Sequence, residues 1–208
     1  MSRRLLLFDI DGTLLSSGPP ASAAFSGALE RVFGTAGSAS TYRFEGRLDP
    51  VIVRELMEEA GIPAETVEAR TREALDLYLD GLEEALAKSR PTLKPGIEAL
   101  VPRVAADPRA VTALLTGNVE RGARIKLTAA GLWHHFAFGV WGDEAPARTG
   151  LGTVALARAA EKTGIAFRGE DCVVIGDSQH DVACGKAIGA RVVAVTTGRT
   201  PRATLEEA

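Results

Sequence analysis

Short runs of consecutive apolar residues, each followed by small or polar residues, recur along the chain. Runs of this kind are typical of strands buried on both faces, as in a parallel sheet. The clearest cover residues 5–8, 111–115 and 172–175, a further run covers 192–195, and a weaker one covers 136–141. We therefore predict five short strands.

Helical patterns separate these runs. Apolar residues recur with helical spacing over residues 119–130, 152–163 and 181–188. Each segment is followed by a glycine, Gly131, Gly164 or Gly189, which suits the left-handed position at a helix C-terminus. Alternating strands and helices predict an α/β fold with a doubly wound parallel sheet, helices on both faces and right-handed connections.

One long stretch interrupts the alternation. Between residues 16 and 90 no strand pattern occurs, whereas residues 21–33, 50–60 and 64–88 have helical patterns. The stretch is flanked by SSGPP (16–20) and RPTLKPG (90–96), whose glycines and prolines are typical of hinges. We predict an all-helical insert at residues 16–90 in a core formed by residues 1–15 and 91–208.

Composition narrows the possible functions. The 208 residues suffice for one domain, or one domain plus a small insert, and 46% of them are hydrophobic. With 24 basic and 27 acidic residues the formal net charge is -3, which argues against a strongly basic nucleic-acid surface. The first apolar run is too short for a signal peptide, and no run approaches membrane length. We expect a cytoplasmic protein with no nucleic-acid or membrane partner.

Polar residues gather where the predicted strands end. Asp9 and Asp11 follow the first strand, and Asp177 and then Asp181 follow the run at 172–175. Ligands of open α/β sheets bind beyond the carboxyl ends of the strands, so these acids should converge. Carboxylates brought together in this way suit a hard cation, and Mg²⁺ is favoured if the substrate is a phosphate.

The pair of acids also suggests covalent chemistry. One carboxylate can attack phosphorus to form an aspartyl-phosphate, while a second protonates the leaving alcohol and later takes a proton from water. Gly12 would let the chain turn sharply enough for Asp9 and Asp11 to reach the same point.

Three motifs resemble those of a known family. FDIDGTL (8–14), LLTGN (114–118) and IGDSQHD (175–181) are similar, in this order, to the motifs of haloacid dehalogenase-like (HAD) hydrolases, and in particular to capped phosphatases of the phosphoglycolate phosphatase-like type. The resemblance runs from residue 5 to residue 198. It implies a Rossmann-like core and assigns the insert at 16–90 to the helical cap domain of that family.

The resemblance also implies roles for individual residues. Asp9 corresponds to the nucleophile and a metal ligand, and Asp11 to the general acid and base, which also offers its backbone carbonyl to the metal. Asp177 would complete the metal shell, with Asp181 in support. The phosphoryl oxygens would be held by Thr116 together with the backbone near Gly117 and Asn118.

The family also uses a cation to neutralise the phosphoryl group. Arg148 is our first choice, because it precedes a predicted helix between the second and last motifs. Lys126 is the alternative, but its neighbours Ile125 and Leu127 suggest that packing sets its face of the helix.

A further loop resembles the substrate-facing loop of capped members. In EGRLD (45–49), Arg47 and Asp49 are candidates for contacting the leaving group of the substrate. An equally weighted alternative is that Asp49 only caps a helix that begins at Pro50.

Together these features predict a magnesium-dependent phosphatase that hydrolyses a small phosphorylated metabolite through a phosphoaspartate, as a monomer or homodimer. A phosphomutase of the same family would share every core motif. From another class, a receiver-type signalling domain could store phosphate on an aspartate, although it would not need a helical insert.

Overall fold

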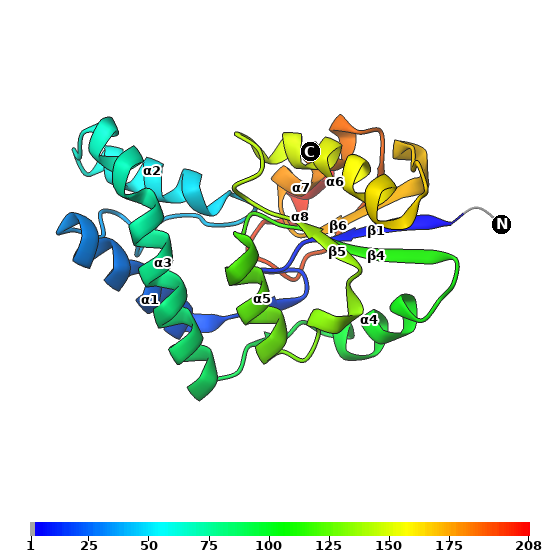
Figure 1. The fold of residues 1–208 in the computed structure, drawn as a ribbon, viewed down its shortest axis with the longest axis horizontal. Coiled ribbons are helices and arrows are strands. Elements are labelled where there is room, and N and C mark those ends of the chain that lie inside the picture. Colours follow the sequence, from blue (N-terminus) through cyan, green and yellow to red (C-terminus); the bar gives the residue numbers. More distant parts are fainter. Residues whose placement is uncertain (1–2) are drawn as a thin grey trace.

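The computed structural model describes residues 3–208, and a parallel sheet forms its centre (Figure 1). The sheet has five strands in the order β5-β4-β1-β6-β7. The strands are β1 (Arg4–Phe8), β4 (Ala110–Leu115), β5 (Phe138–Val140), β6 (Cys172–Gly176) and β7 (Arg191–Ala194). Every pairing is parallel, so the predicted α/β fold class is confirmed.

The central strand is flanked by two partners that end level with it. Phe8, the last residue of β1, lies opposite Leu114 of β4 on one side and Ile175 of β6 on the other. The residues that follow these three strands therefore emerge at the same edge of the sheet. This register explains why motifs far apart in the sequence meet.

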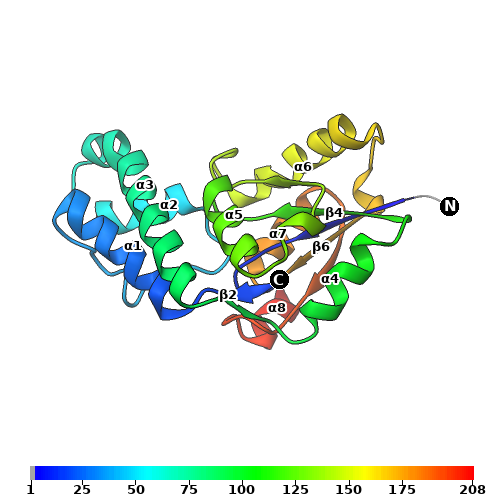
Figure 2. The same ribbon diagram turned by 60° about the horizontal axis from the view of Figure 1, so that its bottom comes forward.

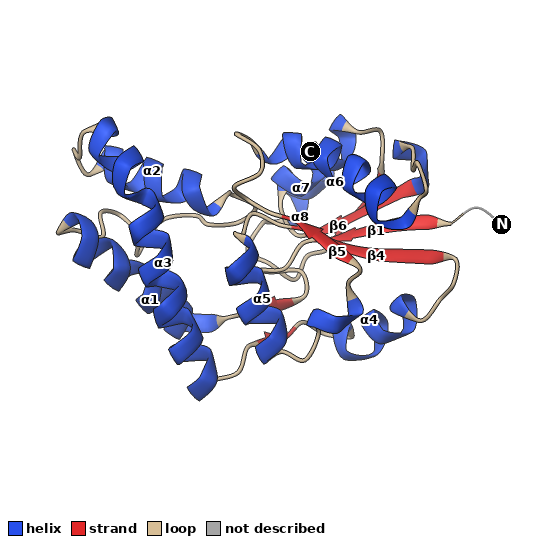
Figure 3. Ribbon diagram, in the orientation of Figure 1, coloured by secondary structure: helices blue, strands red, loops and turns tan. Residues whose placement is uncertain are grey.

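Helices cover both faces of the sheet (Figure 3). The elements α4 (Ile97–Ala105) and α5 (Glu120–Ala129) pack on one face, in a core that includes Phe8, Leu114 and Leu127. On the other face lie α6 (Arg148–Thr163) and α7 (Gln179–Ala187). The short helix α8 (Arg202–Glu207) contacts α7, and two 3₁₀ turns span Trp133–His135 and Gly169–Asp171. The result is a doubly wound core.

The helices between residues 18 and 88 lie beside the sheet and not over it (Figures 1 and 2). They are α1 (Gly18–Phe33), α2 (Asp49–Glu59) and α3 (Ala64–Lys88), and they share a separate hydrophobic core that includes Phe25, Leu56 and Leu82. We call this layer the cap. Its helix α3 also contacts α5 of the core. The domain boundaries at residues 16 and 90 stay a prediction.

Two very short strands join the cap to the core. The strand β2 (Leu15–Ser16) pairs antiparallel with β3 (Thr92–Leu93), so the two connecting segments run side by side. The sequence predicted only hinges here, because a two-residue strand is too short to show a period. Residues 97–105 were not among the predicted helices either, although they form α4 around an internal proline, Pro102.

Several helices begin earlier than their apolar patterns suggested. The helix α1 starts at Gly18 and carries Pro19 and Pro20 in its first turn, where a missing N–H costs nothing. The helix α6 starts at Arg148, and α7 starts at Gln179. The first residues of these helices are glycine, proline or polar residues, so the apolar spacing begins only after them. No helix among the described residues is long and apolar enough to cross a membrane.

Candidate active site

The edge where β1, β4 and β6 end forms the floor of a cavity of about 780 Å³ between core and cap. Asp9, Thr116 and Asp177 follow these strands, and each is at least 96% buried, with exposures of 4%, 0% and 1%. Gly12 turns the chain with a φ of +88°, and a Cβ at this position would lie 2.3 Å from Asp177 Oδ2. The predicted need for glycine in this turn is therefore explained by both backbone conformation and space.

Three buried carboxylates lie together on this floor. Oxygen atoms of Asp9, Asp177 and Asp181 lie within 4.8 Å of one another. Asp177 Oδ1 accepts a hydrogen bond from Thr13 Oγ1 at 3.1 Å, whereas its Oδ2 is buried without a hydrogen-bond partner. A buried, unpartnered carboxylate oxygen beside two further acids fits a divalent cation, so the cluster could hold a metal ion.

The electrostatics of the acids support this interpretation. Burial is the main cause that raises the pKa of Asp9 to about 8, with Asp181 and Asp177 adding to the rise and Arg148 opposing it. Burial, followed by the charge of Asp181, raises the pKa of Asp177 to about 6. Extra positive charge at the floor would therefore favour the ionised carboxylates.

Asp181 differs from Asp9 and Asp177 because both of its carboxylate oxygens accept hydrogen bonds from other residues. Its Oδ2 accepts hydrogen bonds from the Ser178 hydroxyl at 2.6 Å and the Ser178 amide at 3.0 Å, in a capping box that begins α7. Its Oδ1 accepts from Arg148 at 2.5 Å. The capping box fixes the turn after β6, and the predicted role of Asp181 in support of the metal shell stays a prediction.

Arg148 lies in the middle of the buried cluster. Its Nη2 donates to Asp9 Oδ1 at 2.8 Å and to the Leu115 carbonyl at 2.9 Å, in addition to Asp181. The residue is only 5% exposed. Burial acts to lower the pKa of Arg148, but the charges of Asp181 and Asp9 outweigh it and raise the pKa above its ordinary value. The side chain therefore stays charged.

Lys126, the alternative cation, is also part of the site. Its Nζ donates to Asp11 Oδ2 at 2.6 Å and to Asn118 Oδ1 at 2.6 Å, and the residue is 5% exposed. The interpretation that packing sets its face is wrong. Successive residues of a helix differ by about 100° in direction, so Ile125 and Leu127 point to other sides of α5. The site thus contains two buried cations, one beside each catalytic candidate.

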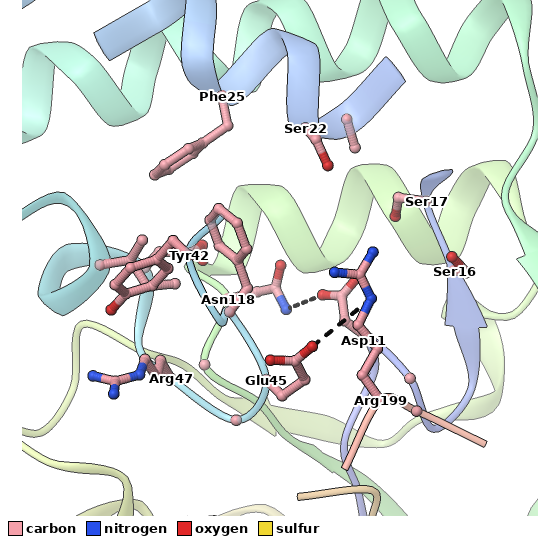
Figure 4. A pocket seen from close by; sticks show the side chains of 18 of the residues that line it. Asp11, Ser16, Ser17, Ser22, Phe25, Tyr42, Glu45, Arg47, Asn118 and Arg199 are labelled. Carbon is pink, nitrogen blue, oxygen red and sulfur yellow. Dashed lines mark hydrogen bonds and ion pairs between the residues drawn. The ribbon is translucent and has the colours of Figure 1, made fainter. Parts of the chain in front are cut away.

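Asp11 lies apart from the clustered carboxylates. Its Oδ2 also accepts a hydrogen bond from Asn118 Nδ2 at 2.8 Å (Figure 4), and its side chain is 43% exposed at the cavity. The side-chain oxygens are not among the grouped metal-ligand atoms, so the clustered set is Asp9, Asp177 and Asp181. The contribution of Asp11 to a metal through its backbone carbonyl stays a prediction.

The turn after β4 brings the second motif to the cavity. Thr116 Oγ1 accepts hydrogen bonds from Asn118 Nδ2 at 2.9 Å and from the Asn118 amide at 3.3 Å. At Gly117 a Cβ would lie 1.9 Å from the Arg47 carbonyl oxygen, so no side chain fits there. Gly117 and Asn118 line the cavity, and Asn118 contacts Asp11, whereas Thr116 is fully buried behind them. The phosphate-binding role of the three residues stays a prediction.

The loop of the cap that was expected to face the substrate has a different arrangement. Arg47 pairs with Glu55, and its guanidinium lies 5.4 Å from the centre of the Tyr42 ring. Figure 4 shows its side chain pointing away from Asp11. Leu48, and not Asp49, is the N-cap of α2, so the alternative in which Asp49 caps its own helix is wrong. Both residues nevertheless line the cavity.

Other cavity residues were missed by the sequence analysis. Ser17, Ser22, Phe25 and Tyr42 line the cap side, and Glu45 forms a 3.9 Å ion pair with Arg199 (Figure 4). No motif marks these residues. The cap residues among them reach the cavity because the cap lies next to the strand ends.

Comparisons with known proteins agree with the geometry. A family model described as haloacid dehalogenase-like hydrolase matches residues 6–186. Phosphoglycolate phosphatase 1 of Pseudomonas aeruginosa is 31% identical, over 94% of this chain and 70% of that protein. Phosphoglycolate phosphatase of Xanthomonas campestris is 29% identical, over 94% and 84% of the two chains.

Solved structures share the fold. A hydrolase from Pseudomonas syringae has a TM-score of 0.73 at 22% identity and covers 99% of this chain and 90% of its own. CbbY from Rhodobacter sphaeroides, solved in complex with phosphate, has a TM-score of 0.65 at 18% identity, over 96% and 90% of the two chains. The resemblance stated from the motifs is confirmed.

Proposed function

The chain belongs to the haloacid dehalogenase-like hydrolase family, and we propose that it is a magnesium-dependent phosphatase that acts on a small phosphorylated metabolite through a phosphoaspartate. As a phosphoric monoester hydrolase it needs a nucleophile, a proton donor and positive charge around the phosphoryl group. The observation that carries the proposal is the position of Asp9, which borders the cavity and whose Oδ1 lies 2.8 Å from Arg148 Nη2.

The first half of the proposed reaction transfers the phosphoryl group. A carboxylate oxygen of Asp9 attacks phosphorus, and the bond between phosphorus and the ester oxygen breaks. Asp11 gives its proton to the departing oxygen, so the alcohol leaves neutral. The proposal is supported by the cavity-facing side chain of Asp11, which is 43% exposed where the leaving group would enter.

The second half restores the enzyme. Asp11, now ionised, takes a proton from a water molecule while the water oxygen attacks phosphorus. The bond between phosphorus and Asp9 breaks, so inorganic phosphate leaves and both aspartates return to their starting forms. Lys126 and Asn118 hold the Asp11 side chain through hydrogen bonds of 2.6 and 2.8 Å, which keeps it oriented in both steps.

Asp9 and Asp177, with the backbone carbonyl of Asp11, are the residues proposed to hold magnesium. When bound, the ion supplies positive charge that offsets the repulsion between an anionic nucleophile and an anionic substrate. Arg148 supplies further charge beside Asp9, while Thr116 and the backbone near Gly117 and Asn118 are proposed to bind the phosphoryl oxygens. The choice of Arg148 over Lys126 for this role is part of the proposal.

Phosphoglycolate is one candidate substrate, because relatives of the chain carry that name, and sugar phosphates are others. The test is a panel of phosphorylated metabolites assayed for phosphate release, with magnesium and with a chelator. We expect release for at least one compound only when the metal is present. Undiminished turnover in metal-free buffer would contradict the mechanism, and transfer of phosphate to a second sugar molecule instead of water would identify a phosphomutase.

A further inference from the structure

The loop that precedes α2 within the cap is packed directly on the turns that carry the second and last motifs. A Cβ on Gly117 would lie 1.9 Å from the carbonyl oxygen of Arg47, and a Cβ on Gly46 would lie 2.1 Å from Ser178 Oγ. The backbone of this loop therefore approaches both turns so closely that neither Gly46 nor Gly117 has room for a side chain. This contact is a feature of the fold that substrate binding alone does not explain.

Asp49 makes the polar part of this contact. Its amide donates to the Gly117 carbonyl at 2.8 Å, and its Oδ2 accepts from the Val119 amide at 3.0 Å. The residue is 9% exposed. Two hydrogen bonds thus attach one cap residue to both ends of the Gly117–Val119 segment, and Asn118 lies between them.

The second of these bonds satisfies the start of α5. Val119 is the N-cap residue of α5, and its own amide is one of those that a helix leaves without an internal acceptor. The Asp49 carboxylate, from another part of the chain, accepts from this amide, and its negative charge also suits a helix N-terminus. Asp49 of α2 therefore stabilises the N-terminus of α5, a helix to which it does not belong.

The consequences reach the catalytic residues through α5. Lys126 on this helix contacts Asp11 and Asn118, and Asn118 itself contacts Asp11 and Thr116. A shift of the α5 N-terminus would move all of these groups together. We propose that Asp49 is a positioning residue whose carboxylate couples docking of the cap loop to the arrangement of the 116–119 turn, and that it does not recognise the leaving group.

This inference rests on the proposed phosphatase function only in its kinetic part. The test compares Asp49→Ala, Asp49→Asn and the control Glu58→Ala, which removes an exposed acid from the same helix. Asparagine keeps an oxygen that can accept from the Val119 amide, whereas alanine does not.

With para-nitrophenyl phosphate and with the best substrate of the metabolite panel, Asp49→Ala should lower kcat by the same factor, about ten- to a hundredfold, with a smaller change in KM. Asp49→Asn should recover most of that loss, and Glu58→Ala should match the wild type. A loss confined to the metabolite, or equal losses for alanine and asparagine, would overturn the positioning role.

Amide hydrogen exchange tests the contact without any activity. In Asp49→Ala the amides of residues 119–123 should exchange at least about tenfold faster, and asparagine should restore their protection. Inorganic phosphate should slow exchange in residues 46–49 and 116–119 together in the wild type but not in the alanine variant. Unchanged exchange would overturn the inference, whereas a wild type inactive towards every phosphate would overturn only the proposed function.

Discussion

Asp9 and Asp11 are two residues apart, yet their surroundings differ in almost every respect. Asp9 is 4% exposed, lies among Asp177, Asp181 and Arg148, and has its pKa raised to about 8, chiefly by burial. The Asp11 side chain is 43% exposed and lies between Lys126 and the cavity. Two positions in one loop therefore have different surroundings. The buried position of Asp9 suits a nucleophile, and the solvent-exposed position of Asp11 suits proton transfer.

The largest expected effect comes from removing the buried carboxylate. Asp9→Asn should reduce turnover by at least about four orders of magnitude, because an amide does not attack phosphorus. Substrate binding should persist, since the cations and the 116–118 turn remain. Steady-state kinetics and equilibrium binding of inorganic phosphate check these two expectations. Turnover near that of the wild type would remove Asp9 as the nucleophile.

Replacing the exposed partner should give a loss that depends on the leaving group. For Asp11→Asn we expect a decrease of about two to four orders of magnitude with an alkyl phosphate, which needs protonation, and a much smaller one with para-nitrophenyl phosphate. The ratio of the two kcat/KM values is the measurement. Equal losses for both compounds would contradict a role for Asp11 in proton transfer.

Arg148 and Lys126 allow the surroundings of Asp9 and Asp11 to be compared, because each cation contacts one of the two aspartates. Arg148→Ala should lower turnover by about two to three orders of magnitude with every substrate, because its Nη2 lies beside the nucleophile. Lys126→Ala should cost much less, about tenfold, and chiefly with poor leaving groups, because its partner is Asp11.

Thermal unfolding and circular dichroism serve as controls, since removing one member of a buried ion pair also costs stability. If the lysine variant proves inactive and the arginine variant stays close to normal, the assignment is reversed.

The smallest expected effect is a change of stability with pH. Burial raises the pKa of Asp9 to about 8 and that of Asp177 to about 6, above the ordinary value of about 4 for an aspartate. Between about pH 4 and pH 8 the folded protein therefore binds more protons than the unfolded chain. Stability of the metal-free protein should therefore fall as the pH rises from about 4 to about 8.

We expect the midpoint of thermal unfolding to drop by several degrees over this range. Magnesium should stabilise the protein more at pH 8 than at pH 5, because the ligands are then ionised. Scanning calorimetry with and without magnesium measures both effects. A metal-free midpoint that rises with pH would show that other groups dominate.

The sequence predicted the parts of the fold that depend on local patterns. The five apolar runs became strands with ends within two residues of their predictions. Burial on both faces leaves few polar positions in β1, β4, β5 and β6, whereas the edge strand β7 is apolar although it is largely exposed. The helices of the cap were found for a similar reason, since their apolar spacing faces a core of their own. The strand pair β2–β3 was missed because two residues are too few to show a period, and α4 and α8 were not predicted either.

The sequence by itself determined which acids lie at one edge of the sheet, and only the tertiary structure decided which of them cluster and what each contacts. Motif order and strand ends suffice to bring Asp9, Asp11 and Asp177 to one edge, because parallel strands end together. The position of Lys126 in the site and the contact of Asp49 with α5 depend on how α5 and the cap are turned relative to the sheet. These orientations result from packing between residues far apart in the chain, such as Asp49 and Val119, and no local spacing encodes them.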